Sequence, residues 1–177
     1  EIPRVSLEDA KAAFEAGTAV FVDVRGADVF AMSHIPGSLS IPLADLESRL
    51  AEACYRRGIA HESLGDTACA LADYDAAIER EPECAPAYNR RGVLRAKKGE
   101  LAPALDDFAA AARFDPQSRR AFWNRGWARL MQNDADAALA DFDAAIALDP
   151  RYVNAYRARA KAYGIKGDLA REAEDEA

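Results

Sequence analysis

The sequence predicts a mostly α-helical protein, in which a solenoid of paired helices follows a small α/β segment. The solenoid is predicted by residues 121–126, AFWNRG, which have counterparts at a constant interval, at 53–58, 87–92 and 155–160. A period of about 20 to 50 residues is typical of solenoids, whose units bury their apolar faces against one another. The α/β segment is predicted by residues 1–50, which lack this period and contain a short β-branched run.

Each repeat is predicted to consist of two helices joined by a tight turn. One recurrent position suits the positive φ that ends the first helix, and it holds Gly65, Gly99, Asn133 and Gly167. A second recurrent position holds Pro82, Pro116 and Pro150. It is expected to end the second helix, because proline lacks a backbone N–H. The predicted repeats are 51–84, 85–118 and 119–152, followed by a partial repeat or cap at 153–177.

Small and aromatic residues recur on the second helix of each repeat. Alanines at two positions should let helix backbones approach closely, and they are Ala70, Ala104 and Ala138, and Ala77, Ala111 and Ala145. Aromatic residues should fill the space between neighbouring repeats, and they are Tyr74, Phe108 and Phe142.

Together these positions resemble the tetratricopeptide repeat (TPR) family over about residues 51–177. The resemblance implies a right-handed α-solenoid whose first helices line a concave groove that binds a peptide or protein segment. The candidate groove residues are Tyr55, Asn89, Val93, Arg120, Trp123, Asn124, Trp127 and Arg157. Trp123 is preferred, since Trp127 could equally pack on a neighbouring helix.

A carboxylate clamp, which some family members use for a C-terminal carboxylate, is matched only in part. Asn89 and Asn124 stand in suitable positions, whereas Val93 and Ala158 stand where polar groups would be needed. A structural scaffold without a peptide ligand is a further possibility.

Arginine on the first helix is followed at a constant interval by aspartate on the second. The pairs are Arg57 and Asp73, Arg91 and Asp107, Arg125 and Asp141, and Arg159 and Asp175. We expect an exposed structural ion pair in each repeat, worth only ~0–1 kcal/mol.

The last repeat departs from the pattern, because Glu172 and Glu176 stand in the small and aromatic positions. Carboxylates are costly to bury unpaired. We therefore expect residues 169–177 to form a short, solvent-facing cap.

Residues 3–50 resemble the first part of a rhodanese domain. The resemblance rests on Asp23-Val24-Arg25, Phe30, His34-Ile35-Pro36-Gly37 and Ile41-Pro42, with Ser33 where the family usually has glycine. The expected elements are a helix at 6–16, a strand at 19–24, a short helix at 27–32, a turn at 34–38, an extended piece at 39–42 and a helix at 43–50.

The chemistry of that family needs a thiolate in a later loop, and no such loop is found. Cys54 follows a stretch that reads as helix and fits the repeat register, so we expect no catalytic residue and no enzyme activity. The alternative function is a sulfurtransferase or sulfur carrier whose catalytic half is absent from this chain. The incomplete sheet could be covered by the first repeat helix or by another chain through self-association, or the segment could be loosely ordered. A further alternative is that the junction near Leu50 results from a fusion.

Composition restricts the partners further. The net charge of −7 without a dominant basic patch argues against nucleic acid. The absence of an apolar run of about 18 residues and of a leader argues against a membrane, so we expect a soluble protein, with the cytoplasm slightly favoured. Cys54, Cys69 and Cys84 form no CxxC motif or Cys/His cluster, so no metal site and no cofactor are expected.

Overall fold

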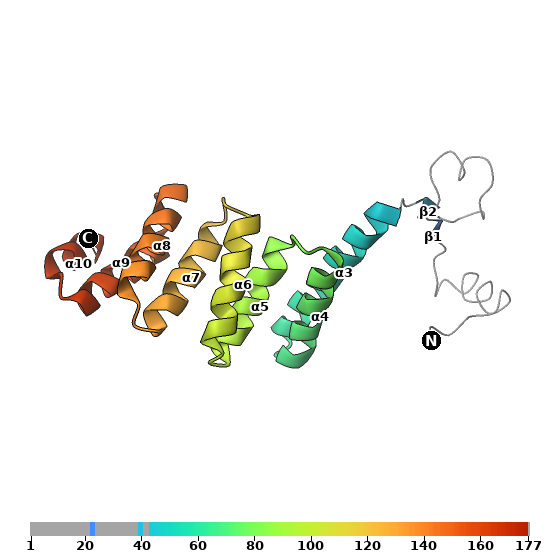
Figure 1. Cartoon of the computed structure of the whole chain (residues 1–177), viewed down its shortest axis with the longest axis horizontal. Coiled ribbons are helices and arrows are strands. Elements are labelled where there is room, and N and C mark those ends of the chain that lie inside the picture. Colours follow the sequence, from blue (N-terminus) through green and yellow to red (C-terminus); the bar gives the residue numbers. More distant parts are fainter. Residues whose placement is uncertain (1–21, 24–38, 41–42, 177) are drawn as a thin grey trace. The chain divides into compact units, whose positions relative to one another are not determined.

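The structure is a computed structural model that describes residues 22–23, 39–40 and 43–176 (Figure 1). The chain divides into two compact units, residues 1–50 and residues 51–177. The division falls inside α3, which runs without a break from Leu43 to Ser63 and includes the helix predicted at 43–50.

The described part of the first unit is a pair of parallel strands. β1 (Val22–Asp23) pairs with β2 (Leu39–Ser40), and Val22 lies opposite Leu39. The predicted strand and extended piece are therefore confirmed where they are described. The helices predicted at 6–16 and 27–32 and the turn at 34–38 lie outside the described residues.

The second unit is a row of antiparallel helix pairs, in which each pair stacks on the next (Figure 1). The helices that follow α3 are α4 (Thr67–Arg80), α5 (Ala85–Lys97), α6 (Leu101–Phe114), α7 (Arg119–Met131), α8 (Ala135–Leu148), α9 (Val153–Lys166) and α10 (Leu169–Glu176). This is the mostly α solenoid that the sequence period predicts. None of the helices within residues 43–176 is long and apolar enough to cross a membrane.

The turn residues behave as the sequence predicts. The φ angles of Gly65, Gly99, Asn133 and Gly167 are 79°, 83°, 64° and 77°. Each second helix with a following proline ends shortly before it, since α4, α6 and α8 end at Arg80, Phe114 and Leu148.

The core consists of small residues around one aromatic ring per repeat. The recurrent alanines are fully buried, as are Tyr74, Phe108 and Phe142. Phe108 packs with Ala104 of its own repeat and Ala128 of the next, so the aromatic position does fill the space between repeats. It also presses on its own repeat, because a Cβ added to Gly92 would lie 2.7 Å from Phe108 Cε1.

All four predicted Arg–Asp pairs form, but the prediction that they are exposed is wrong for the aspartate of each pair, although the Arg57 side chain of the first pair is 65% exposed. Arg91 Nη2 lies 2.6 Å from Asp107 Oδ1, and only 3% of the Asp107 side chain is exposed. Arg95 Nη1 donates a further hydrogen bond of 2.8 Å to Asp107 Oδ2. The carboxylate is buried because the helices approach closely at Gly92, where an added Cβ would lie 3.1 Å from Asp107 Cβ.

The C-terminal helix α10 packs on α9 and is mostly solvent-facing. Leu169 is 71% exposed, and Glu172 lies half-buried against Gly164. The exception is Asp175, whose side chain is 6% exposed and accepts a 2.6 Å hydrogen bond from Arg159 Nη2. The cap is therefore short, as expected, but it is fixed to α9 by one buried ion pair.

Candidate functional site

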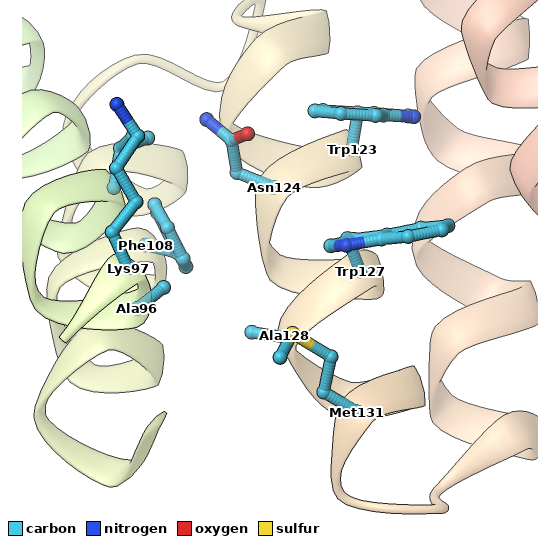
Figure 2. Close-up of a pocket in the computed structure, with 9 residues that line it drawn as sticks. Ala96, Lys97, Phe108, Trp123, Asn124, Trp127, Ala128 and Met131 are labelled. Carbon is cyan, nitrogen blue, oxygen red and sulfur yellow. The ribbon is translucent and has the colours of Figure 1, made fainter. Parts of the chain in front are cut away.

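The first helices of successive repeats lie next to one another, because α5 contacts α7 and α7 contacts α9. An open hollow of about 300 Å³ lies between α5 and α7 and is also lined by Phe108 of α6, and Figure 2 shows the residues that line it. Its lining is mainly apolar, and it includes Val93, Lys97, Trp123, Asn124, Trp127 and Met131.

Two tryptophans dominate this hollow. Trp123 and Trp127 are one helical turn apart on α7, so they share a face, and their rings stack with centroids 6.1 Å apart and an interplanar angle of 14°. Figure 2 shows the two indoles one above the other on one side of α7, while Asn124 and Ala128 project from the other side. Both tryptophans pack partly against the core and keep part of their surface exposed.

Trp123 also connects α7 to the last repeat. Its Nε1–H donates a 3.0 Å hydrogen bond to the carbonyl oxygen of Asn154, and its ring meets Tyr152 edge-on at 6.4 Å. Trp127 lies beneath the Lys161 ammonium group, which is 5.0 Å from the centre of the ring. Each tryptophan therefore both stabilises the stack of repeats and lines the hollow.

A second hollow, of about 170 Å³, is polar and lies toward the N-terminal repeats. It involves α3, α5, α7 and the loop before α7, and its lining includes Tyr55, Asn89, Arg90, Asp115, Ser118 and Arg120. The Asn124 side-chain amide donates a 2.8 Å hydrogen bond to Asn89 Oδ1. Since Asn124 lines the apolar hollow and Asn89 the polar one, this bond links the linings of the two hollows.

Seven of the eight residues predicted for a groove are therefore brought together in two groups. The apolar hollow contains Val93, Trp123, Asn124 and Trp127, and the polar hollow contains Tyr55, Asn89 and Arg120. Arg157 lines neither hollow and is exposed on α9. Lys97, Met131 and Arg90 were missed, although Lys97 and Met131 occupy the same position in successive repeats.

The thiols do not resemble a sulfur-transfer site. Cys54 lies half-buried in the middle of α3, not in a loop that opens a helix. The pKa of the Cys69 thiol is raised, chiefly by its hydrogen bond to Asp66, and burial raises the pKa of Cys84. A transferable sulfur needs a thiolate of lowered pKa, so neither of these two thiols has the required environment.

One cluster of polar side chains was not predicted from the sequence. Candidate ligand atoms of His61, Asp66 and Cys69 lie within 4.8 Å of one another, although these residues form no recognisable metal motif in the sequence. Asp66 caps α4 by accepting a 3.1 Å hydrogen bond from the backbone N–H of Cys69. We assign the cluster this capping role.

Comparison with known proteins agrees with the repeat architecture. The sequence model of the tetratricopeptide repeat matches residues 55–119, 104–153 and 123–177, and that of the rhodanese-like domain matches residues 6–81. An HTH-type transcriptional regulator of Mycobacterium tuberculosis is 39% identical over 67 residues. That match spans 38% of this chain and 29% of the regulator.

Several solved structures share the fold. MamA from Desulfovibrio magneticus RS-1 is 25% identical with a TM-score of 0.66, and the match covers 71% of each chain. The TPR domain of Arabidopsis OM64 is 24% identical with a TM-score of 0.64, over 67% of this chain and 98% of that domain. The first TPR of Spaghetti (RPAP3), bound to the HSP90 peptide SRMEEVD, is 20% identical with a TM-score of 0.63, over 70% and 95%. The fold is thus that of a protein-interaction module.

Proposed function

The chain belongs to the tetratricopeptide repeat family, and from this premise we propose that it binds an extended peptide or protein segment along its first helices, without catalysis of its own. The proposal rests on the two hollows across α3, α5 and α7, whose linings are linked by the Asn89–Asn124 hydrogen bond. An extended segment can occupy both, because the concave face of a solenoid is continuous from repeat to repeat.

The side chains of the apolar hollow suit a protein ligand. Aromatic and arginine residues contribute most of the binding energy at protein interfaces. The stacked Trp123 and Trp127 offer such a surface, and Met131, which is 54% exposed, extends it. A small number of polar groups beside an apolar hollow is the usual way to orient a ligand, and Asn124 and Lys97 are placed for this.

The proposal can be tested by selecting peptides from a random display library on the full chain and measuring their affinity by calorimetry. Met131→Glu, at the apolar hollow, should weaken the selected peptides at least about tenfold, equivalent to about 1.4 kcal/mol. Leu64→Glu is the matched control, because Leu64 is 82% exposed in a turn and lines neither hollow. If Met131→Glu changed the affinity of none of the selected peptides, binding in this groove would be refuted.

Trp123→Ala is a second test, and it affects both binding and stability. Loss of the ring should weaken binding by more than ~1 kcal/mol. Because Trp123 also bonds to Asn154 and packs on Tyr152, the variant should melt at a lower temperature as well. Affinity must therefore be measured well below the melting transition of the variant.

The rhodanese-like match over residues 6–81 makes sulfur transfer the alternative function. A thiosulfate:cyanide transfer assay on the full chain separates the two functions. We expect no turnover, because Cys54 lies within a helix and the thiols of Cys69 and Cys84 have raised pKa values. Turnover that disappears in Cys54→Ser would establish the alternative.

A further inference from the structure

Cationic side chains line both hollows, and two more lie on the neighbouring helix α9. Arg90 and Arg120 line the polar hollow, and Lys97 lines the apolar one. On α9, the Lys161 ammonium group lies over the ring of Trp127, and Arg157 precedes Lys161 by one helical turn, so it shares that face. The five cations are spread over three neighbouring helices, α5, α7 and α9.

Much of this positive charge is not neutralised by the chain itself. Among the described residues 49–175, no carboxylate lies within 4.0 Å of Arg120, Arg157 or Lys161. Two acidic residues do lie close by: Glu62 is near Arg90 and Lys97, and Asp115 lines the polar hollow. Glu62 accepts a 2.9 Å hydrogen bond from the Tyr74 hydroxyl and lies 3.4 Å from Arg90 and 4.0 Å from Lys97. Asp115 accepts a 3.1 Å hydrogen bond from the backbone N–H of Gln117.

The positive groove is opposite in sign to the protein as a whole. The chain has a net charge of −7, yet the recurrent aspartates, such as Asp107 and Asp141, are turned into the interior and paired with arginine. The first-helix face is therefore left with an excess of cations. Such a local field attracts ligands of negative charge and raises their association rate.

Building on the proposed function, we propose that the groove is selective for an internal acidic peptide segment with an apolar side chain. Its carboxylates face Arg120, Arg90 and the α9 cations, and its apolar side chain rests between Val93, Trp127 and Met131. Several side-chain carboxylates fit this arrangement better than a single chain end, because only Arg90 and Arg120 share a hollow, whereas Lys97 lines the other hollow and Lys161 and Arg157 lie on α9.

Single-stranded nucleic acid is the competing ligand, since stacked aromatics beside cations can also hold bases and phosphates. A peptide is favoured, because the whole chain is acidic and such a chain repels an extended polyanion outside the groove. The two ligand classes are separated by the experiment below.

The test compares the peptides selected on the full chain with the unselected library. We expect the selected peptides to be enriched in Asp and Glu. Their affinity should fall at least about tenfold on Arg120→Glu, fall with added salt, and stay unchanged when the peptide C-terminus is amidated. The matched control is Arg80→Glu, because Arg80 is an exposed arginine on the second helix α4 and lines neither hollow.

Different outcomes reject different claims. Selected peptides that respond to Met131→Glu but show neither acidic enrichment nor sensitivity to Arg120→Glu would overturn this inference and leave the proposed function intact. Sensitivity to C-terminal amidation would replace side-chain recognition by chain-end recognition. A third outcome would overturn both the proposed function and this inference. In that outcome no peptides are selected, and a fluorescent single-stranded oligonucleotide binds with micromolar or better affinity. Its binding is abolished by Arg120→Glu.

Discussion

The buried aspartate of each repeat is the residue on which the helix pair depends most. The Asp107 carboxylate accepts hydrogen bonds from two nitrogens of Arg91 and from one nitrogen of Arg95, and the residue is almost fully buried. Removing one partner of a buried pair leaves the other charge uncompensated, which costs about 3 kcal/mol or more. Asp107→Ala leaves Arg95 without this partner and Arg91 with Asp75 as its remaining one, so it should lower the free energy of unfolding by about 3 kcal/mol in a urea titration.

The neighbouring acid provides the control for this prediction. Asp106 is on the same helix but exposed, so Asp106→Ala should change stability by less than about 0.5 kcal/mol. A double-mutant cycle of Arg91 with Asp107 should give a coupling above about 1 kcal/mol. A smaller coupling would mean that water reaches the pair in solution.

The glycine opposite this pair gives a second residue-scale prediction. Alanine favours a helix over glycine by up to about 1 kcal/mol, but Gly92→Ala would place a Cβ 2.7 Å from Phe108 Cε1 and 3.1 Å from Asp107 Cβ. Overpacking of a tight core costs about 1–3 kcal/mol. We expect Gly92→Ala to lower the melting temperature.

Gly164→Ala is the contrasting variant. The nearest neighbour of its added Cβ is the flexible carboxylate end of Glu172, which can move away, so stability should be unchanged or raised. Equal losses in the two variants would show that helix packing does not decide the effect. The chain already contains the alanine version of Gly92 in the last repeat, where Ala160 accompanies Glu176 instead of an aromatic residue.

At the residue scale, spacing predicted partners but not burial. The constant interval was sufficient to pair every arginine with its aspartate. Whether the pair is exposed depends on how closely the two helices pack. They pack closely at Gly92, and the Asp175 side chain is likewise only 6% exposed in the last repeat, where Ala160 replaces the glycine. The glycine was visible in the sequence, but its consequence for the charge of Asp107 on the other helix was not.

At the scale of single elements, the C-terminal helix is the weakest part of the solenoid. Among the described helices, α10 packs mainly against α9, and it has eight residues. Short helices fray when little apolar surface holds them. Amide hydrogen exchange of residues 169–176 should therefore be much faster than that of Ala138–Ile146 in α8.

The buried pair of α10 supplies a control within the same experiment. Asp175→Asn removes the partner of Arg159, so exchange in α10 should become faster still while α8 is unaffected. Protection in α10 equal to that in α8 would contradict the fraying cap and indicate that another surface covers this helix.

Helix boundaries in the repeats could be predicted because glycine, asparagine and proline fix them by local chemistry, as at Asn133 and Pro150. The continuity of α3, in contrast, could not be predicted from the sequence. Residues 43–50 and the first repeat helix each had a helical pattern, and no proline or glycine between Leu43 and Ala53 separates them. A boundary between two sequence patterns is therefore not a break in the backbone.

At the scale of the whole solenoid, ion pairs also connect successive repeats, but not at every interface of the described repeats. Arg91 bonds to Asp75 of the preceding repeat, and Arg159 bonds to Asp143, each at 2.6 Å. The described interface between these two has no such bond, because Ala109 stands in the corresponding position opposite Arg125. This uneven distribution of inter-repeat ion pairs could not be predicted from a single repeat, since such pairs form only when repeats stack.

Ala109→Asp should complete the series. Ala109 is exposed on α6. The new carboxylate would stand in the position opposite Arg125, whose Nη2 and Nε are already bound to Asp141; in Arg91 and Arg159 the Nη1 nitrogen makes the bond to the preceding repeat. Because aspartate is a poorer helix former than alanine, the proper control is Ala109→Asn, which has similar helix propensity and no charge. Relative to that control, Ala109→Asp should raise the free energy of unfolding by about 0.2–1 kcal/mol at low salt.

The difference in free energy between the two variants should shrink when the salt concentration is raised to about 1 M, since exposed ion pairs are screened. Equal stabilities of the two variants at low salt would show that the inter-repeat pairs of Arg91 and Arg159 follow from packing and do not contribute to it.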